Sequence, residues 1–108
     1  MSSTQSTVKF IVGQMSNAGA VVYKKMFGEY GIYCEGKMVA LVCGDKLFVK
    51  PTIRGRAYIG DVVEESPYHG AKPSFLISVE KLEDREWLSE LIRITTEELP
   101  APVKTKGR

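Results

Sequence analysis

The sequence predicts a single α+β domain in which helices accompany an antiparallel sheet. Apolar residues recur at helical spacing near both ends of the chain, and short apolar runs separated by glycine-containing turns lie between them. The chain has 108 residues, of which 44% are hydrophobic, so it can build one hydrophobic core. We expect residues 8–99 to form this domain, residues 1–7 a flexible N-terminus and residues 100–108 a basic, disordered tail.

An N-terminal helix is predicted between Val8 and Met15. Apolar side chains recur there at positions 8, 11, 12 and 15, which lie on one face of a helix. Ser6 or an earlier serine or threonine can cap the first turn, and Asn17 and Gly19 tolerate the left-handed backbone that ends many helices. The segment therefore predicts a short helix with one apolar stripe.

An antiparallel meander is predicted to follow. Residues 20–26 are rich in β-branched and aromatic side chains and are expected to form a strand or an extended lead-in. Three strands are predicted at 30–34, 37–43 and 46–50, with two-residue turns at Glu35-Gly36 and Gly44-Asp45, the second with glycine in the leading position. The middle strand is apolar on both faces, as expected of a covered central strand. Alternation assigns Met38, Ala40 and Val42 to one face and Val39, Leu41 and Cys43 to the other.

The last third of the sequence predicts a short helix, an additional strand and a C-terminal helix. The short helix is expected over residues 53–59, closed by Gly60, and a loop over residues 66–74 is indicated by two prolines and a glycine. A strand is predicted over residues 75–79. Asp84 is placed to cap the last helix, whose inner face is expected to comprise Trp87, Leu88, Leu91, Ile92 and Thr95. Pro100 and Pro102 are expected to end the fold.

The composition argues for an ordinary cytoplasmic protein. No apolar run approaches the roughly 20 residues of a membrane span, and residues 1–7 lack the basic and apolar regions of a secretory signal. Two cysteines do not make a disulfide framework. The net charge is +2, but residues 1–60 hold eight basic and three acidic residues, whereas residues 61–99 hold four basic and ten acidic ones. Such polarity can steer a charged partner.

No complete catalytic or metal-binding set stands out, so neither a cofactor nor a metal is expected. The Gly28-Glu29-Tyr30-Gly31 segment lies between strand-like segments, which differs from the helix–helix context of an RNA-binding G-x-x-G loop, and it lacks the lysine of a phosphate loop. Its glycines are interpreted as turn or close-packing positions. Cys34 and Cys43 are expected to lie at opposite ends of the first hairpin, too far apart to share a metal.

A candidate partner surface is predicted from basic and aromatic residues that could gather at one edge of the meander. They are Lys24, Lys25, Tyr30, Tyr33, Lys46, Lys50, Arg54 and Arg56. Such a set suits either a protein partner or single-stranded nucleic acid, whose phosphates pair with lysine and arginine while its bases stack on aromatic rings. A further alternative is a small-molecule or enzymatic pocket beside Tyr30, Tyr33, Cys34 and His69, in which a cysteine–histidine pair would act.

The order of these motifs resembles the N-terminal domain of the TfoX/Sxy competence regulators. The resemblance covers about residues 8–99 and rests on Met26-Phe27-Gly28-x-Tyr30-Gly31-x-Tyr33, Gly36-Lys37-Met38, Ala40-Leu41-Val42, Leu47-Phe48-Val49-Lys50, Gly55-Arg56, Pro67-Tyr68, Ser74-Phe75 and Trp87-Leu88. Glu29 stands where the family commonly has a second glycine. Longer members carry a further C-terminal domain.

The resemblance implies an α+β fold and a role in transcription of DNA-uptake genes, in cooperation with the cyclic-AMP receptor protein. It supplies no catalytic residues. We therefore expect a non-enzymatic regulatory domain that acts by protein–protein contact, through an edge strand of the meander that binds a partner or a second copy. Direct nucleic-acid binding through the basic edge and a small-molecule or enzymatic role are the alternatives.

Overall fold

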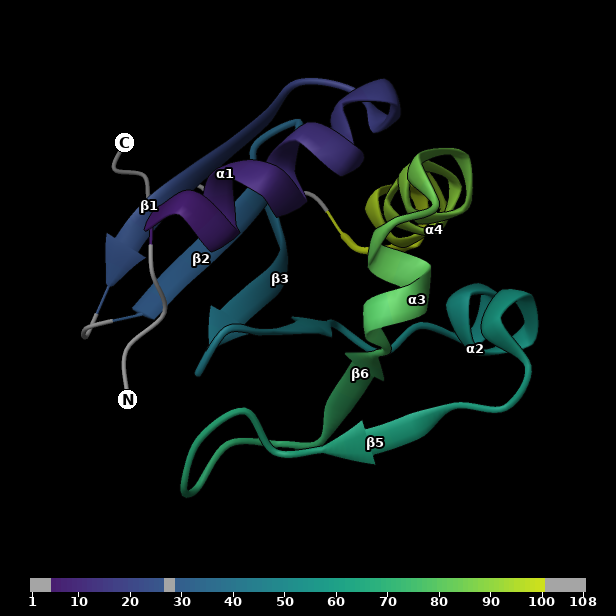
Figure 1. Cartoon of the computed structure of the whole chain (residues 1–108). Helices are drawn as coiled ribbons and strands as arrows, with labels where there is room; N and C mark the ends of the chain where they lie inside the picture. Colours follow the sequence, from purple (N-terminus) through teal and green to yellow (C-terminus); the bar gives the residue numbers. More distant parts are fainter. Residues whose placement is uncertain (1–4, 27–28, 101–108) are drawn as a thin grey trace, which may run out of the picture.

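The protein is an α+β domain in a computed structural model that describes residues 5–26 and 29–100 (Figure 1). This confirms the predicted fold class. The helices are α1 (Gln5–Gln14), the 3₁₀ turn η1 (Ser16–Ala18), α2 (Ile53–Ile59), α3 (Val79–Leu82) and α4 (Arg85–Glu98). The strands are β1 (Val21–Met26), β2 (Glu29–Cys34), β3 (Lys37–Cys43), β4 (Lys46–Val49), β5 (Val63–Glu65) and β6 (Ser74–Ile77). None of the described helices has the length and apolar character that crossing a membrane requires.

The strands form one antiparallel sheet in the order β1-β2-β3-β4-β6-β5. β1 to β4 are the predicted meander, extended by the 20–26 segment, which is a full strand. β5 was not predicted, because it is only three residues long and contains two glutamates, which are depleted in strands. Among the described residues, β1 and β5 are the edges of the sheet.

Both hairpin turns occur where they were predicted, and both are type I′. Glu35 and Gly36 have φ of 52° and 81°, and Gly44 and Asp45 have φ of 58° and 61°. Positive φ at both central residues defines this turn, whose twist matches that of the flanking strands. The second turn thus holds Asp45 as well as Gly44 in the left-handed region, rather than the glycine alone.

A β-bulge at Val39 corrects the predicted faces of the central strand. Ile32 pairs with Ala40, but the next pair is Tyr33 with Met38, so Val39 has no partner opposite it on β2. The extra residue brings Val39 into the core, where it is fully buried. Simple alternation had placed Met38 with Ala40, whereas the bulge turns it to the other face, beside Leu41.

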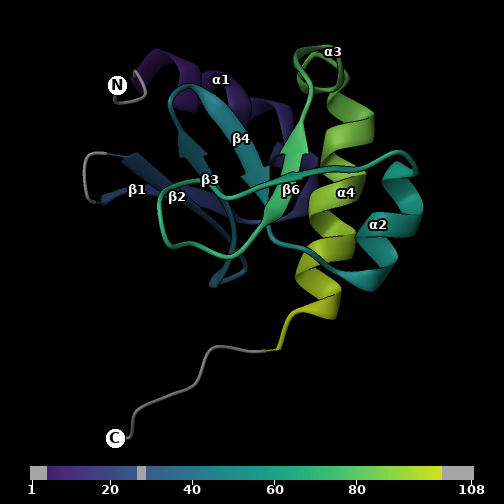
Figure 2. The same ribbon diagram turned by 90° about the horizontal axis from the view of Figure 1, so that it is seen from below.

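One face of the sheet packs on α1 and α4, and this layer holds the core. Its largest fully buried side chains include Ile11, Met15, Ile32, Leu47, Phe75, Leu88, Leu91 and Ile92. In Figure 2, α4 runs beside β6, and α2 lies on the outer side of α4. Asp84 caps α4 as predicted, since its carboxylate accepts a hydrogen bond from the Trp87 N–H (3.1 Å). Trp87 itself is half-buried and stacks on Tyr58, with ring centroids 5.4 Å apart.

The end of one strand and the position of one helix cap differ from the prediction. The strand predicted over residues 75–79 ends at Ile77, because the Ser78 side chain caps α3. Helix α3 was not predicted, because its single turn is too short to show a helical period. Gln5 is the first described residue and is already helical, so Ser6 lies inside α1 rather than at its cap. Residues 1–4, with the earlier candidate caps, and residues 101–108 of the predicted tail lie outside the described residues.

Candidate functional site

The open face of the sheet carries an apolar hollow of about 630 Å³. This face is turned away from α1 and α4, and no described helix covers it. The hollow is lined by Met26, Glu29, Met38, Leu41, Cys43, Lys50 and Tyr68. The first five come from β1, β2 and β3, whereas Tyr68 belongs to the loop between β5 and β6, which extends below these strands in Figure 1. The hollow therefore has a sheet floor and a loop wall.

The floor depends on the glycine at position 31. A Cβ atom on Gly31 would lie 2.7 Å from the Met38 Cε atom and 3.0 Å from the Met26 Sδ atom. Glycine therefore lets both methionine side chains lie across β2. Methionine side chains are flexible and polarisable, so this floor can adapt its shape to a contact.

Charged groups surround the apolar floor. Lys24 lies over the Tyr33 ring, with its ammonium 5.4 Å from the ring centroid, and Lys46 shares the open face with its cross-strand partner Cys43. Burial, and then the negative charge of Glu29, raise the pKa of the Cys43 thiol. Cys43 therefore stays protonated at neutral pH, which suits an apolar lining residue better than a nucleophile.

The structure brings together only part of the predicted basic and aromatic surface. Lys24, Tyr33, Lys46 and Lys50 lie on the open face. Tyr30 points to the opposite face, where it is buried in the core and meets Tyr23 edge-on. Lys25, its cross-strand partner, is exposed on the outer strand.

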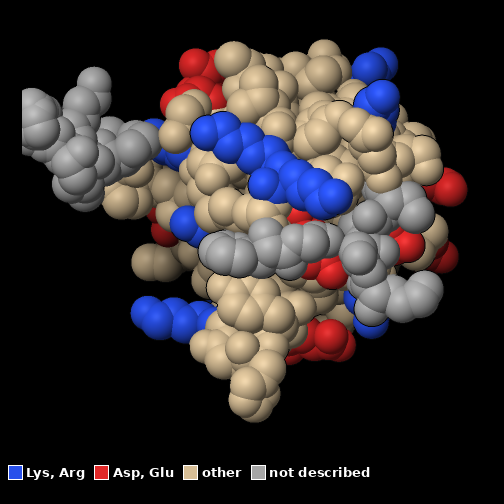
Figure 3. Space-filling model, turned by 90° about the vertical axis from the view of Figure 1, so that its left-hand side faces the viewer, with Lys and Arg blue, Asp and Glu red and all other residues tan. Residues whose placement is uncertain are grey.

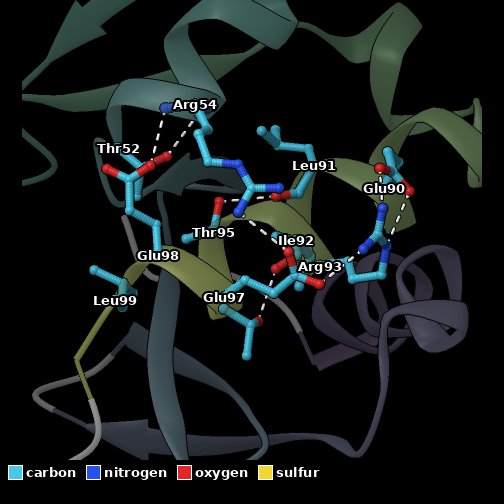
Figure 4. Close-up of polar contacts among 12 residues, drawn as sticks. Thr52, Arg54, Glu90, Leu91, Ile92, Arg93, Thr95, Glu97, Glu98 and Leu99 are labelled. Carbon is cyan, nitrogen blue, oxygen red and sulfur yellow. Dashed lines mark hydrogen bonds and ion pairs between the residues drawn. The ribbon is translucent and has the colours of Figure 1, made fainter.

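Arg54 and Arg56 lie away from the hollow, in α2, and each is engaged in an ion pair. Arg54 pairs with Glu97 of α4 at 3.1 Å (Figure 4). Arg56 pairs with Glu64 of β5. Figure 4 also shows Glu98 at the start of α2, where its carboxylate accepts hydrogen bonds from the backbone N–H of Ile53 and of Arg54. Arg54 therefore helps to join α2 to α4, and Arg56 helps to join α2 to β5.

Both basic and acidic side chains lie on the side of the molecule that Figure 3 shows. Lysine and arginine cross the middle of this view, and aspartate and glutamate lie close around them. A continuous basic stripe, which a nucleic-acid backbone would follow, is not formed on this side by the described residues.

The proposed cysteine–histidine pocket is not the hollow that forms. Tyr30, Tyr33, Cys34 and His69 are all missing from the described lining of the hollow. Cys34 is fully buried and directs its thiol at the Ala18 carbonyl (3.9 Å), whereas His69 is exposed in a loop. Both cysteines are free thiols, and the described residues contain no group of three or more histidine, cysteine, aspartate or glutamate side chains arranged to hold a metal.

A second candidate surface is the outer edge of β1, along which none of the described strands pairs. The Glu35 N–H donates to the Ala20 carbonyl (3.0 Å) and the Ala20 N–H donates to the Glu35 carboxylate (2.7 Å), so the backbone groups of these two residues face each other as in a hydrogen-bonded pair. Such pairs recur at every second residue of an antiparallel ladder. The backbone groups of Lys24 therefore face β2, whereas those of Tyr23 and Lys25 face the free edge. Six residues long and without an acidic residue, β1 is an available edge for strand addition.

Sequence reasoning missed the hollow. Met26, Met38, Leu41 and Tyr68 were each noted, but as strand, family or loop residues. The available signal was the central strand, which is apolar on both faces. The sequence predicted that both faces are covered, whereas no described helix covers the face that carries the hollow. The bulge that turns Met38 towards the hollow, and the approach of Tyr68 from a distant loop, leave no local trace in the sequence.

The chain belongs to the TfoX N-terminal domain family, whose model matches residues 13–99. This confirms the resemblance and suggests a competence-related regulatory role. The chain is similar to the "Uncharacterized 12.7 kDa protein in trpE 5'region" of Spirochaeta aurantia, with 32% identity over 108 residues. The match spans 100% of this chain and 93% of that relative, so the relative also consists almost entirely of the matched region.

Proposed function

We propose that this protein is a non-enzymatic regulatory domain that acts in the cytoplasm by protein–protein contact, in the transcriptional control of DNA-uptake genes. Membership of the family supports the regulatory role. The proposed mode of action rests on one observation, which is the free and basic edge of β1.

Strand addition uses backbone groups for affinity and side chains for selection. Tyr23 and Lys25 offer backbone donors and acceptors at the edge of β1, and Val22 is 55% exposed beside them. The side chains of Lys24 and Lys25 would flank an added strand on its two faces. An extended segment with an aspartate or glutamate beside each lysine therefore fits this edge best.

A second copy of the chain is the alternative occupant of this edge. Two β1 strands paired with each other would bring Lys24 and Lys25 of both copies onto one short ribbon. Like charges at neighbouring cross-strand positions destabilise a sheet, so a different, acidic protein is favoured over a homodimer. A sizing measurement separates the two, since the favoured occupant leaves the isolated chain a monomer.

The proposal can be tested in cells of the source organism that lack this protein. Complementation uses the wild type, Lys25→Ala and Lys25→Pro, and transcripts of DNA-uptake genes are measured. Lys25→Pro removes an edge N–H that β2 does not use, and proline is tolerated at such edge positions. The wild type and Lys25→Ala should restore the transcripts, whereas Lys25→Pro should not. Circular dichroism should show that Lys25→Pro keeps its folded structure. Equal restoration by all three forms, or transcripts that do not depend on the protein, would contradict the proposal.

A further inference from the structure

We propose that the hollow on the open face binds a small amphipathic carboxylate, whose apolar part lies over Met26, Met38 and Leu41 and whose carboxylate pairs with Lys50. This site is separate from the β1 edge on which the regulatory proposal rests. Binding of a carboxylate there would allow a small molecule to regulate the domain.

The size and lining of the hollow fit a small molecule. Its volume of about 630 Å³ lies within the range of roughly 300–1,000 Å³ that is typical of small-ligand sites. Such sites are mostly apolar and contain a few polar groups that fix orientation. Here the apolar part is two methionines, a leucine and the protonated Cys43, and Tyr68 forms a wall opposite the sheet.

Besides the Cys43 thiol and the Tyr68 phenol, two ionisable groups line the hollow, Lys50 and Glu29. They determine which charge a ligand carries. Lys50 is half-buried, and the ion pairs found among the described residues involve arginines rather than this ammonium. A half-buried ammonium in an apolar lining binds an anion more strongly than an exposed lysine does, because water competes less. A single positive charge suits a monoanion, and a carboxylate joined to an apolar body meets both requirements.

The second ionisable group fixes the orientation of the ligand. Glu29 lies across the sheet from Cys43, at one end of β3, and its carboxylate accepts a hydrogen bond from the Gly44 N–H (3.4 Å). Lys50 lies at the other end, where its backbone N–H donates to the Val39 carbonyl (2.8 Å). Val39 and Cys43 are four residues apart on β3, which separates the two ends by about 13 Å. Glu29 would repel the ligand carboxylate from its own end, so the carboxylate is directed to Lys50.

The methionines provide a direct test. Protein labelled with ¹³C at the methionine methyl groups is titrated with decanoate below its micelle concentration, and with decanol as the uncharged match. Decanoate should shift the methyl signals of Met26 and Met38 saturably. The signal of Met15, which is fully buried in the core on the helix side, should stay in place. Unchanged Met26 and Met38 signals, or an equal shift of Met15, would overturn the proposal.

Two substitutions test the charge and the space separately. Lys50→Met keeps the aliphatic stem and should weaken decanoate binding about tenfold or more, because one charge-assisted hydrogen bond is lost, while decanol binding is unchanged. Lys9→Met, at an exposed position of α1, is the matched control and should leave both unchanged. Gly31→Ala should weaken both ligands, since its methyl group displaces Met26 and Met38 into the hollow. Decanoate binding that does not respond to Lys50→Met would refute a carboxylate site.

Discussion

Replacement of Lys37 with methionine is predicted to destabilise the fold by about 2 kcal/mol. The Lys37 ammonium reaches from β3 to the end of α4, where it donates hydrogen bonds of 2.8 Å to the carbonyl oxygens of Thr96 and Leu99. The last carbonyls of a helix have no partner within the helix, and a cation near them is also favoured by the helix dipole.

The magnitude follows from the two bonds that would be lost. A hydrogen bond to a charged group contributes roughly 1.5–3 kcal/mol in a protected setting, and about 1 kcal/mol is reasonable for each of these partly buried bonds. Methionine retains most of the aliphatic stem, so packing changes little. For a domain of this size, about 2 kcal/mol corresponds to a fall in Tm of roughly 10 °C.

Urea unfolding followed by circular dichroism gives the free energy of unfolding for the wild type, Lys37→Met and the control Lys9→Met. The control removes an exposed lysine from α1 and should stay within about 0.5 kcal/mol of the wild type. If Lys37→Met is as stable as the control, the contact between β3 and α4 contributes nothing and the reasoning fails.

Three further predictions concern other groups. Thr52→Ala should cost about 1 kcal/mol in urea unfolding, because the buried Thr52 hydroxyl caps α2 by accepting the Gly55 N–H at 2.9 Å; an unchanged midpoint would refute that role. Hydrogen bonds from the N–H groups at the start of α2 lower the pKa of Glu98 in the folded state. The ionised Glu98 carboxylate therefore stabilises the fold above its unfolded pKa of about 4.3, and this stabilisation is lost as the pH falls through the folded pKa. Glu98→Gln should therefore flatten the pH dependence of unfolding below about pH 5, and an unaltered profile would contradict this assignment. The raised pKa of Cys43 predicts slower alkylation by iodoacetamide at pH 8 than for free cysteine, with a faster rate in Glu29→Gln; a rate equal to that of free cysteine would show that the thiol is not shielded.

The parts of the fold that the sequence predicted are those that local chemistry determines. The two hairpin turns need residues that tolerate positive φ, and both the turns and the Asp84 cap can be read within a few neighbouring residues. The short elements β5 and α3 were missed. Three residues at a sheet edge and a single helical turn are too short to show a period, and the pairing with β6 and the packing against α4 stabilise them instead.

The candidate site was less predictable, because it is formed by tertiary contacts. Alternation fails at the bulge of Val39, and with it the expected face of Met38. The eight basic and aromatic residues were grouped by their proximity in sequence. The sheet turns Tyr30 inward, and the fold places Arg54 and Arg56 on α2, where they pair with Glu97 of α4 and Glu64 of β5. Register and chain path, rather than residue type, decide which of them share a surface.

Site-specific photo-crosslinking in the source organism tests the proposed protein contact most directly. A photoreactive residue replaces Val22, which is exposed at the β1 edge, and in a second strain it replaces Val79, which is 71% exposed on α3. The account predicts that position 22 crosslinks to one defined protein with an acidic extended segment, that position 79 does not, and that Lys25→Pro abolishes the product. A product at position 22 that survives Lys25→Pro, or no product at that position, would contradict the account.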